Sequence, residues 1–303
     1  MRTTEVTEFD DRRELLVAGH VNVDWFLRVD RFPATDRTAP VVDQRKELGG
    51  TAANLARVGA SLGVRTGLAT RLGDGFPTAF EEILRTSHID LRGVERVPGL
   101  PTPTCFLLED TAHATRTLIE QGPMGIGPTR PALRRSWLGE YAWVHLTTGP
   151  PAWGLELAAA ARRAGLRVAV DPAQEVHYRW DRAHLRRLLA SAEILFGNRS
   201  EIDRILELLG VRSERELLEQ VPLVIRTEGR NGAVAFSRTG TVTVPATRPH
   251  RVVTMVGAGE AFRGGFYAAW FAGEPLRGCL GAGTRSAARW IEGERPQTRG
   301  KGG

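Results

Sequence analysis

The chain has 303 residues, and its hydrophobic (42%) and charged (25%) fractions are those of an ordinary globular protein. Its formal charge is +6, but the arginines that supply it are scattered beside glutamates, without the basic tract or interleaved aromatic residues of a nucleic-acid-binding protein. Two cysteines, Cys105 and Cys279, are too few for a disulfide framework or a cysteine zinc site. No apolar run reaches membrane-spanning length and no signal-peptide pattern opens the chain, so we expect a cytoplasmic protein without membrane or nucleic-acid partners.

Short strand-like and helical segments alternate in the first half of the chain. The apolar run 15–19 ends in glycine and is typical of a buried first strand. The spacing of small and apolar residues predicts helices over 51–62 and 76–86. Further strands are expected at 25–29, 40–44, 65–72, 104–108 and 116–119, the last two as a hairpin.

The alternation becomes regular after residue 143. Strands are expected at 143–146, 167–170, 194–196 and 223–225, and helices at 153–164, 182–190 and 201–209. A β-type run at 251–253 then precedes a helix over 261–271. This order predicts an α/β fold whose mainly parallel sheet is covered on both faces, with ligands bound beyond the carboxyl ends of the strands.

The most informative motif is Gly257-Ala258-Gly259, followed directly by Glu260 where the last helix begins. Small residues allow backbone N–H groups to turn inward at a helix N-terminus, which makes a site for phosphate. A carboxylate beside such a site would repel phosphate unless it has a chemical task. The natural task is to accept a proton from a hydroxyl that attacks a phosphoryl group.

Two polar residues, Asn22 and Asp24, follow the first strand, and strand alternation places both on one side. Together they suit a hydroxylated ligand. Asparagine and aspartate are equally common in plain turns at strand ends, so both interpretations stay open.

A glycine pair, Gly49-Gly50, precedes the helix expected over 51–62, with Asn54 one turn later. Such a pair allows a ligand to approach the backbone closely. The alternative is a flexible helix start with Thr51 as its N-cap.

Two further loops carry weaker patterns. Asn198 and Glu201 are spaced so that they can hold a hydrated Mg²⁺ together. The same spacing is that of a capping box, and the sequence favours the capping box. Thr227, Gly229 and Gly232 lie between two expected strands and suit either a nucleotide-facing loop or a hairpin turn. The remaining polar candidates are assigned to solvated surface: Arg71, Gln121 and Arg263.

Taken in order, these motifs resemble the ribokinase-like (PfkB) family of sugar and nucleoside kinases over nearly the whole chain. The family has an aspartate after its first strand, a Gly-Gly…Asn helix, an Asn-x-x-Glu motif, a Thr-x-Gly-x-x-Gly loop and an Asp-Thr-x-Gly-Ala-Gly-Asp signature. The resemblance implies an α/β three-layer sandwich with a mainly parallel central sheet and a small β-sheet lid. It implies one kinase domain over 13–298, with lid strands within 25–45 and 102–120 and flexible termini at 1–12 and 299–303.

Carried over by position, the resemblance also implies an activity and a set of roles. The activity is transfer of the terminal phosphoryl group of a nucleotide, by resemblance ATP, to a hydroxyl of a sugar or nucleoside with the help of Mg²⁺. Glu260 would be the base, and the anion hole would be formed by Gly257, Ala258 and Gly259. The acceptor would be bound by Asn22, Asp24, Gly49, Gly50 and Asn54, the nucleotide by Asn198, Thr227, Gly229 and Gly232, and the metal by Glu201. The lid would close over the acceptor, and such lids often mediate dimerisation.

Three positions depart from the family signature. Glu260 stands in place of the usual aspartate base, and Thr254-Met255 replaces the leading Asp-Thr. Glutamate keeps the charge but moves the carboxylate by about one C–C bond, and a misplacement on the order of 1 Å can cost about 100-fold in rate. Two interpretations follow: an active kinase with Glu260 as its base, or an impaired homologue that binds sugar or nucleotide without efficient transfer. A dinucleotide fingerprint is disfavoured, since the motif comes late in the chain and Phe262 takes the place of its third glycine.

Overall fold

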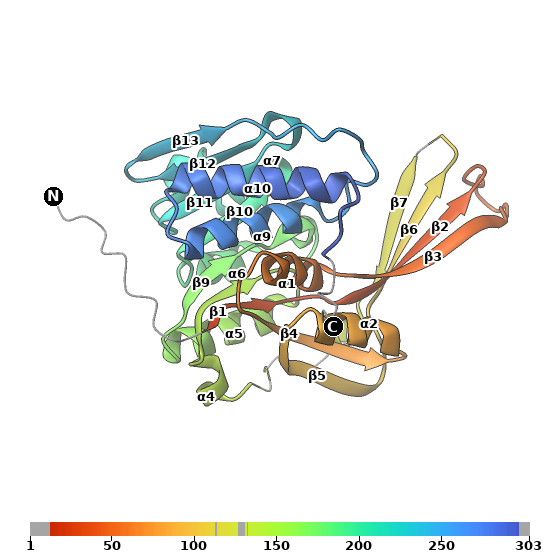
Figure 1. Ribbon diagram of the computed structural model, residues 1–303, viewed down its shortest axis with the longest axis horizontal. Coiled ribbons are helices and arrows are strands. Elements are labelled where there is room, and N and C mark those ends of the chain that lie inside the picture. Colours follow the sequence, from red (N-terminus) through yellow and green to blue (C-terminus); the bar gives the residue numbers. More distant parts are fainter. Residues whose placement is uncertain (1–12, 113, 127–130, 132, 297–303) are drawn as a thin grey trace, which may run out of the picture.

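The computed structural model describes residues 13–112, 114–126, 131 and 133–296. The flexible termini expected at 1–12 and 299–303 lie outside the described residues. Figure 1 shows a large body of strands and helices, from which a smaller sheet projects to one side. Among the described residues, no helix is both long enough and apolar enough to cross a membrane.

A nine-stranded sheet forms the centre of the large body, in the order β13-β12-β11-β10-β9-β8-β1-β4-β5. Its strands are β1 (Arg13–Ala18), β4 (Thr66–Asp74), β5 (Asp90–Pro101), β8 (Tyr141–Leu146), β9 (Arg167–Val170), β10 (Ile194–Asn198), β11 (Leu223–Thr227), β12 (Ala233–Ser237) and β13 (Gly240–Val244). The strands from β11 to β5 are parallel, and β12 and β13 add antiparallel pairs at one edge. The expected mainly parallel sheet is therefore confirmed.

The helices lie on both faces of this sheet. They are α1 (Thr51–Ser61), α2 (Thr78–Thr86), α3 (Pro123–Ile126), α4 (Arg135–Leu138), α5 (Pro151–Arg163), α6 (Arg182–Leu189), α7 (Arg199–Leu209), α8 (Glu214–Leu217), α9 (Ala258–Phe271) and α10 (Leu276–Ile291), with short 3₁₀ turns η1 (Ala173–His177) and η2 (Gly229–Asn231). Helices α5, α6 and α7 cover one face, while α1, α9 and α10 cover the other.

Alternation along β1 explains how one strand serves both layers. Leu16 and Ala18 pack into the core beneath α5, α6 and α7, whereas Leu15 and Val17 pack into the core beneath α1, α9 and α10. All four side chains are fully buried. A strand covered on both faces needs such an unbroken apolar run, and the expected three-layer sandwich is confirmed.

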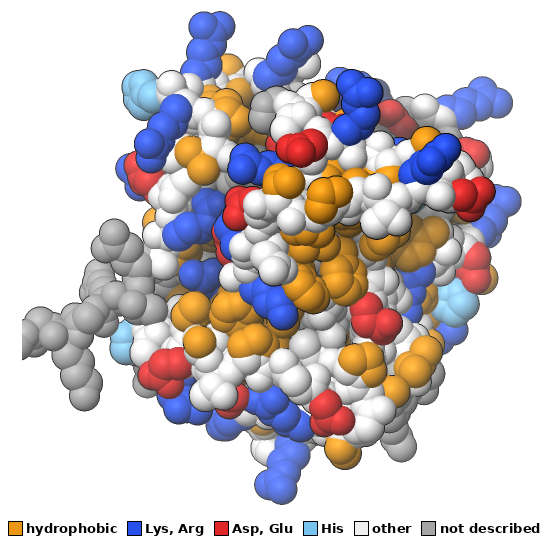
Figure 2. All heavy atoms as spheres, turned by 90° about the vertical axis from the view of Figure 1, so that its right-hand side faces the viewer, with side chains coloured by type: hydrophobic (Ala, Val, Ile, Leu, Met, Phe, Trp, Pro, Cys, Tyr) orange, Lys and Arg blue, Asp and Glu red, His pale blue; other side chains and the backbone are white. Residues whose placement is uncertain are grey.

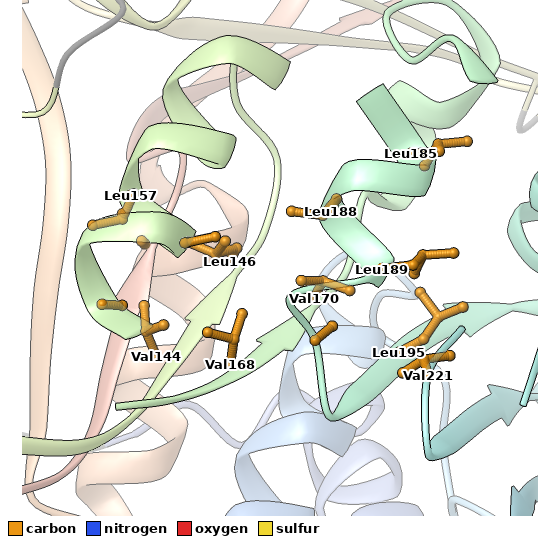
Figure 3. Close-up of a cluster of buried hydrophobic side chains, with 14 of the residues drawn as sticks. Val144, Leu146, Leu157, Val168, Val170, Leu185, Leu188, Leu189, Leu195 and Val221 are labelled. Atoms are coloured by element: carbon orange, nitrogen blue, oxygen red, sulfur yellow. The ribbon is translucent and has the colours of Figure 1, made fainter. Parts of the chain in front are cut away.

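The first of these cores is shown in Figure 3. Aliphatic side chains of α5 and α6, such as Leu157 and Leu188, belong to the same buried cluster as Val144, Val168 and Leu195 of the sheet. This close packing holds the strands in place, and so fixes where their carboxyl ends lie.

The second sheet contains four strands in the order β3-β2-β6-β7. They are β2 (Asn22–Val29), β3 (Val41–Gly49), β6 (Thr104–Asp110) and β7 (Thr115–Glu120). Strand β2 pairs antiparallel with β3 and parallel with β6, so the two segments expected to form a small sheet meet through β2. The expected hairpin of β6 and β7 is also present.

Several parts of the fold differ from the sequence expectation, and three of them are informative. The run 251–253 is not a strand: Val252 and Val253 are exposed, and the Val253 N–H donates to the Ile291 carbonyl at the end of α10 (2.8 Å). Strand β5 and helix α10 were not expected. Both carry Gly or Pro and several charged residues, which mask their periodicity.

Candidate active site

A cleft of about 220 Å³ lies at the carboxyl ends of the parallel strands, between the root of the second sheet and the N-terminus of α9. We call it the central cleft. The predicted residues that line it are Asn22, Asp24, Gly50, Asn54, Glu201, Gly257 and Glu260. Residues from four of the sequence motifs, far apart along the chain, therefore meet in one place.

Strand β2 presents two polar side chains to this cleft. Asn22 and Asp24 are buried, with exposed fractions of 6% and 8%, and they belong to a strand rather than to a turn. The Asn22 Oδ1 atom is buried and has no hydrogen-bond partner among the described residues. Burial, with the charges of Glu47 and Glu260 nearby, raises the pKa of Asp24 from 3.8 to about 7.

The glycine pair gives these side chains room. A Cβ at Gly49 would lie 1.9 Å from the Asp24 Oδ2 atom, so only glycine leaves the carboxylate its place. Gly50 has a φ of 95° and is the N-cap of α1. Thr51, which the alternative of a flexible helix start places at the N-cap, is instead the first residue of the helix. Asn54, one turn into α1, is 7% exposed and lines the cleft.

The N-terminus of α9 forms the opposite wall. Gly257 is its N-cap in a left-handed conformation (φ 86°), and the amides of Gly257 and Gly259 have no backbone partner among the described residues. The Ala258 amide donates to the Met255 carbonyl in a long hydrogen bond of 3.3 Å. Because the helix dipole and free N–H groups meet here, this end of α9 suits an anion.

A tryptophan fixes the loop that leads into α9. The Trp290 indole Nε1 donates to the Val256 carbonyl at 2.6 Å. A Cβ on Gly257 would lie 2.6 Å from the Trp290 ring, so the ring lies directly against this glycine. The sequence motif did not predict this contact, because Trp290 lies in the last turn of α10, a helix that the sequence analysis did not predict.

Glu260 is the third residue of α9 and is partly buried at the edge of the cleft. Burial raises the pKa of its carboxyl group, while Arg263 and the Glu260 backbone amide oppose that rise. A carboxyl group with a raised pKa binds a proton more readily than an exposed glutamate does. Its environment therefore makes Glu260 a better proton acceptor at neutral pH.

A buried ion pair supports this wall from behind and was missed by the sequence analysis. Arg263 and Asp171 are 4% and 3% exposed and meet at 2.5 Å. Asp171 follows β9, and burial raises its pKa while Arg263 opposes the rise. The assignment of Arg263 to solvated surface is wrong; its place one turn after Glu260 was the available signal.

The other two surface assignments also need correction. Arg71 is fully buried and donates from Nε to Glu95 at 2.8 Å. Gln121 is partly buried and donates from Nε2 to the Glu175 carboxylate at 3.3 Å.

Asn198 and Glu201 form the capping box that their spacing favours. Asn198 Oδ1 accepts from the Glu201 N–H (3.0 Å) and Glu201 Oε2 accepts from the Asn198 N–H (2.7 Å), which is a complete capping box. Glu201 is nevertheless 8% exposed and lines the central cleft. The described residues hold no group of three or more metal-binding His, Cys, Asp or Glu side chains, so a cation at Glu201 would depend mostly on water and phosphate oxygens. Mg²⁺ prefers such a ligand set.

The residues predicted to face the nucleotide form a separate group. Asn198 and Thr227 are register partners at the carboxyl ends of β10 and β11, with Gly229 and Gly232 in the loop that follows. None of these four lines the central cleft. Gly232 has a φ of 97°, and a Cβ there would lie 2.0 Å from the Val244 carbonyl oxygen, so the tight turn requires glycine.

Known proteins similar to this chain are kinases of carbohydrates and nucleosides. The pfkB family of carbohydrate kinases matches residues 12–299. A nucleoside kinase of Methanothermobacter thermautotrophicus is 32% identical over 288 residues, which cover 94% of this chain and 92% of that protein. An ATP-dependent ribose-1-phosphate kinase of Halopiger xanaduensis is 34% identical over 261 residues, or 84% of each chain. The crystal structure of the Methanocaldococcus jannaschii nucleoside kinase, a member of the ribokinase family, matches with a TM-score of 0.86 at 26% identity over 95% of both chains.

Proposed function

Because the chain belongs to the pfkB family of carbohydrate kinases, whose members are phosphotransferases with alcohol acceptors, we propose that it transfers the terminal phosphoryl group of ATP to a hydroxyl of a ribosyl compound. The relatives named above act on nucleosides and on ribose 1-phosphate, and both kinds of molecule contain a ribosyl group. We propose that the central cleft binds this shared ribosyl group.

One observation carries the proposal. Asn22 Oδ1 is a buried oxygen acceptor without a donor among the described residues, and it lines the same cleft as the Asp24 carboxylate and Glu260. Buried acceptors are costly unless donors reach them. Neighbouring hydroxyls of a sugar are such donors, and their hydrogen bonds to Asp24 would hold one further hydroxyl near Glu260.

In the proposed mechanism, Glu260 accepts the proton of the attacking hydroxyl. The raised pKa of its carboxyl group favours this task, which typically contributes about 10²–10⁴-fold to the rate. The amides of Gly257, Ala258 and Gly259 lie at the positive end of α9 and would stabilise the charge on the transferring phosphoryl group. Arg263 keeps Glu260, Glu201 and Asp171 close together by offsetting their mutual repulsion.

Glu201 would hold a magnesium ion through the carboxylate oxygen that the capping box leaves free. When bound, Mg²⁺ neutralises charge on the nucleotide phosphates. Asn198, Thr227, Gly229 and Gly232 support a nucleotide site beside it, since the loop turns tightly at the carboxyl ends of two adjacent strands. Closure of the second sheet over the cleft would exclude water from the transfer.

The test is phosphoryl transfer from Mg-ATP to a panel of nucleosides, ribose and ribose 1-phosphate, with the product detected by mass spectrometry. We expect the wild type to phosphorylate at least one of them and Glu260→Gln to lose about 10²–10⁴-fold in kcat. The matched control is Glu156→Gln, an exposed position on α5, which should keep wild-type kcat. A wild type that transfers to no acceptor, with activity restored by Glu260→Asp, would instead support the impaired homologue.

The second sheet also supports the expected dimer. Its residues Val41, Val42 and Leu118 are 49%, 47% and 63% exposed. Figure 2 shows the side of the molecule from which the second sheet projects, with hydrophobic side chains gathered in its middle. We propose that two copies associate there, and sedimentation equilibrium of the wild type and Leu118→Arg tests it: a wild type that remains monomeric rejects the dimer.

A further inference from the structure

A second cleft, of about 530 Å³, adjoins the central cleft and shares Asp24, Asn54 and Val256 with it. We call it the distal cleft. It lies between the root of the second sheet, α1, α2, the loop before α9 and the end of α10. A ligand held by Asp24 would therefore extend from Glu260 on one side into the distal cleft on the other.

Basic side chains dominate the distal cleft. Those that line it are Arg45, Lys46, Arg57 and Arg295, against the two carboxylates Asp24 and Glu47. Arg45 pairs with Glu47 (Nε to Oε1, 2.7 Å), and Lys46 lies over the Trp25 ring at 4.0 Å. Arg57 and Arg295 are left without a carboxylate partner among the described residues.

Arg57 is the most unusual of these residues. It lies on α1, one turn after Asn54, and only 9% of it is exposed. Its Nε atom is buried without a hydrogen-bond partner, and its guanidinium group makes no ion pair within the described part of the chain. Burial and the charge of Arg295 both lower the pKa of Arg57, while the nearby charge of Glu47 opposes that fall.

A buried guanidinium group without an ion pair, as in Arg57, is expensive, and a bound anion would remove that cost. Arginine suits a phosphate monoester in particular, since its planar group offers parallel N–H donors to two phosphate oxygens. The Arg45 guanidinium, 4.0 Å from the ring centroid, covers a face of Phe26 and so leaves less aromatic surface for a nucleobase to stack on.

We propose that the distal cleft binds a phosphate group carried by the acceptor at the end opposite its reacting hydroxyl, with Arg57 and Arg295 as the phosphate ligands. The inference rests on the proposed function and narrows its acceptor to a ribosyl phosphate, such as ribose 1-phosphate. Asp24 and Asn22 bind the sugar hydroxyls between the phosphate and the reacting hydroxyl.

Binding measured without nucleotide separates this inference from the kinase proposal. Isothermal titration calorimetry with ribose 1-phosphate, ribose and adenosine should give the tightest binding for ribose 1-phosphate. Arg57→Met keeps the bulk of the side chain and removes its charge, and we expect it to weaken ribose 1-phosphate binding about 10–100-fold. Arg186→Met, at an exposed site on α6, is the matched control and should bind as the wild type does.

Each result decides one proposal. Tighter binding of adenosine than of ribose 1-phosphate, or an unchanged Kd for ribose 1-phosphate in Arg57→Met, overturns the phosphate subsite. Thermal unfolding of Arg57→Met shows whether it is folded, and Arg295→Gln provides a second variant with the same expected direction. Binding of ribose 1-phosphate through Arg57 without any phosphoryl transfer would retain the subsite and reject the kinase.

Discussion

The substitution Gly49→Ala should displace the Asp24 carboxylate from the central cleft. An alanine Cβ would lie 1.9 Å from Oδ2, 2.1 Å from Cγ and 2.4 Å from Oδ1 of Asp24. The φ of Gly49 lies outside the left-handed region, so its backbone can accept alanine. The side chain of Asp24 therefore has to move.

The size of the effect follows from these distances. Ordinary contact begins at 3.4 Å, so Oδ2 must move by about 1.5 Å, the difference between 3.4 Å and 1.9 Å. A misplacement on the order of 1 Å costs about 100-fold where positioning is the main catalytic device. We expect kcat/KM for the ribosyl acceptor to fall by about 100-fold. The overpacking should also cost about 1–3 kcal/mol of stability.

Steady-state kinetics with Mg-ATP and urea unfolding measure the two effects. The matched control is Gly154→Ala on α5, where the nearest atom to the new Cβ is a Trp180 ring carbon at 3.9 Å. We expect this variant to keep wild-type kinetics and to gain up to about 1 kcal/mol of stability from the better helix former.

A double-mutant cycle shows whether Asp24 carries the effect. In Asp24→Ala the clashing atoms are absent, so adding Gly49→Ala should cost less than about 0.5 kcal/mol of further stability. The reasoning is refuted if Gly49→Ala alone keeps kcat/KM within about threefold of the wild type, since that corresponds to less than about 0.7 kcal/mol of transition-state binding.

Three further predictions concern charge and packing around the cleft. Burial penalises Asp24 only when it is charged. Because its pKa is about 7 in the folded protein, the free energy of unfolding should fall as the pH rises from about 4 to about 7. Asp24 contributes a loss of about 3 kcal/mol from pH 5 to pH 8, and this contribution should be absent in urea unfolding of Asp24→Asn; equal slopes for both proteins would contradict the raised pKa. Arg263→Met leaves Asp171 buried without its partner and should destabilise by about 3–5 kcal/mol in urea unfolding, with part recovered when Asp171→Asn is added. Gly257→Ala, at a φ of 86° and with its Cβ 2.6 Å from the Trp290 ring, should lower the melting temperature and kcat together; a change in neither would exclude the close packing of that ring.

Much of the fold could be predicted because its signals are local. The run of Leu15 to Ala18 is apolar at every position, as a strand covered on both faces must be. The helices α5, α6 and α7 follow their strands at regular spacing, which implies parallel pairing. The strand predicted at 251–253 is wrong because β-branched and long residues form a strand only where a partner strand is near. Here the chain packs against the end of α10 instead.

The candidate site was predicted only where each motif is contiguous in the sequence. Asp24 and Glu260 were found through their neighbours, and the structure places both in the central cleft. Asp171 and Arg263 were missed because their pairing joins two layers of the fold, which no local pattern records. The Asn198–Glu201 spacing was ambiguous for a different reason: one side chain caps α7 and lines the cleft at the same time.

Single-turnover transfer tests the central claim most directly, since it separates the chemical step from acceptor binding. Wild type and Glu260→Gln are mixed in excess over radiolabelled Mg-ATP and a saturating ribosyl acceptor, and quenched on the millisecond scale. The proposed mechanism predicts that Glu260→Gln slows transfer by about 10²–10⁴-fold while the acceptor Kd stays within about threefold of the wild type. Equal transfer rates in the two proteins would contradict the assignment of Glu260 as the base.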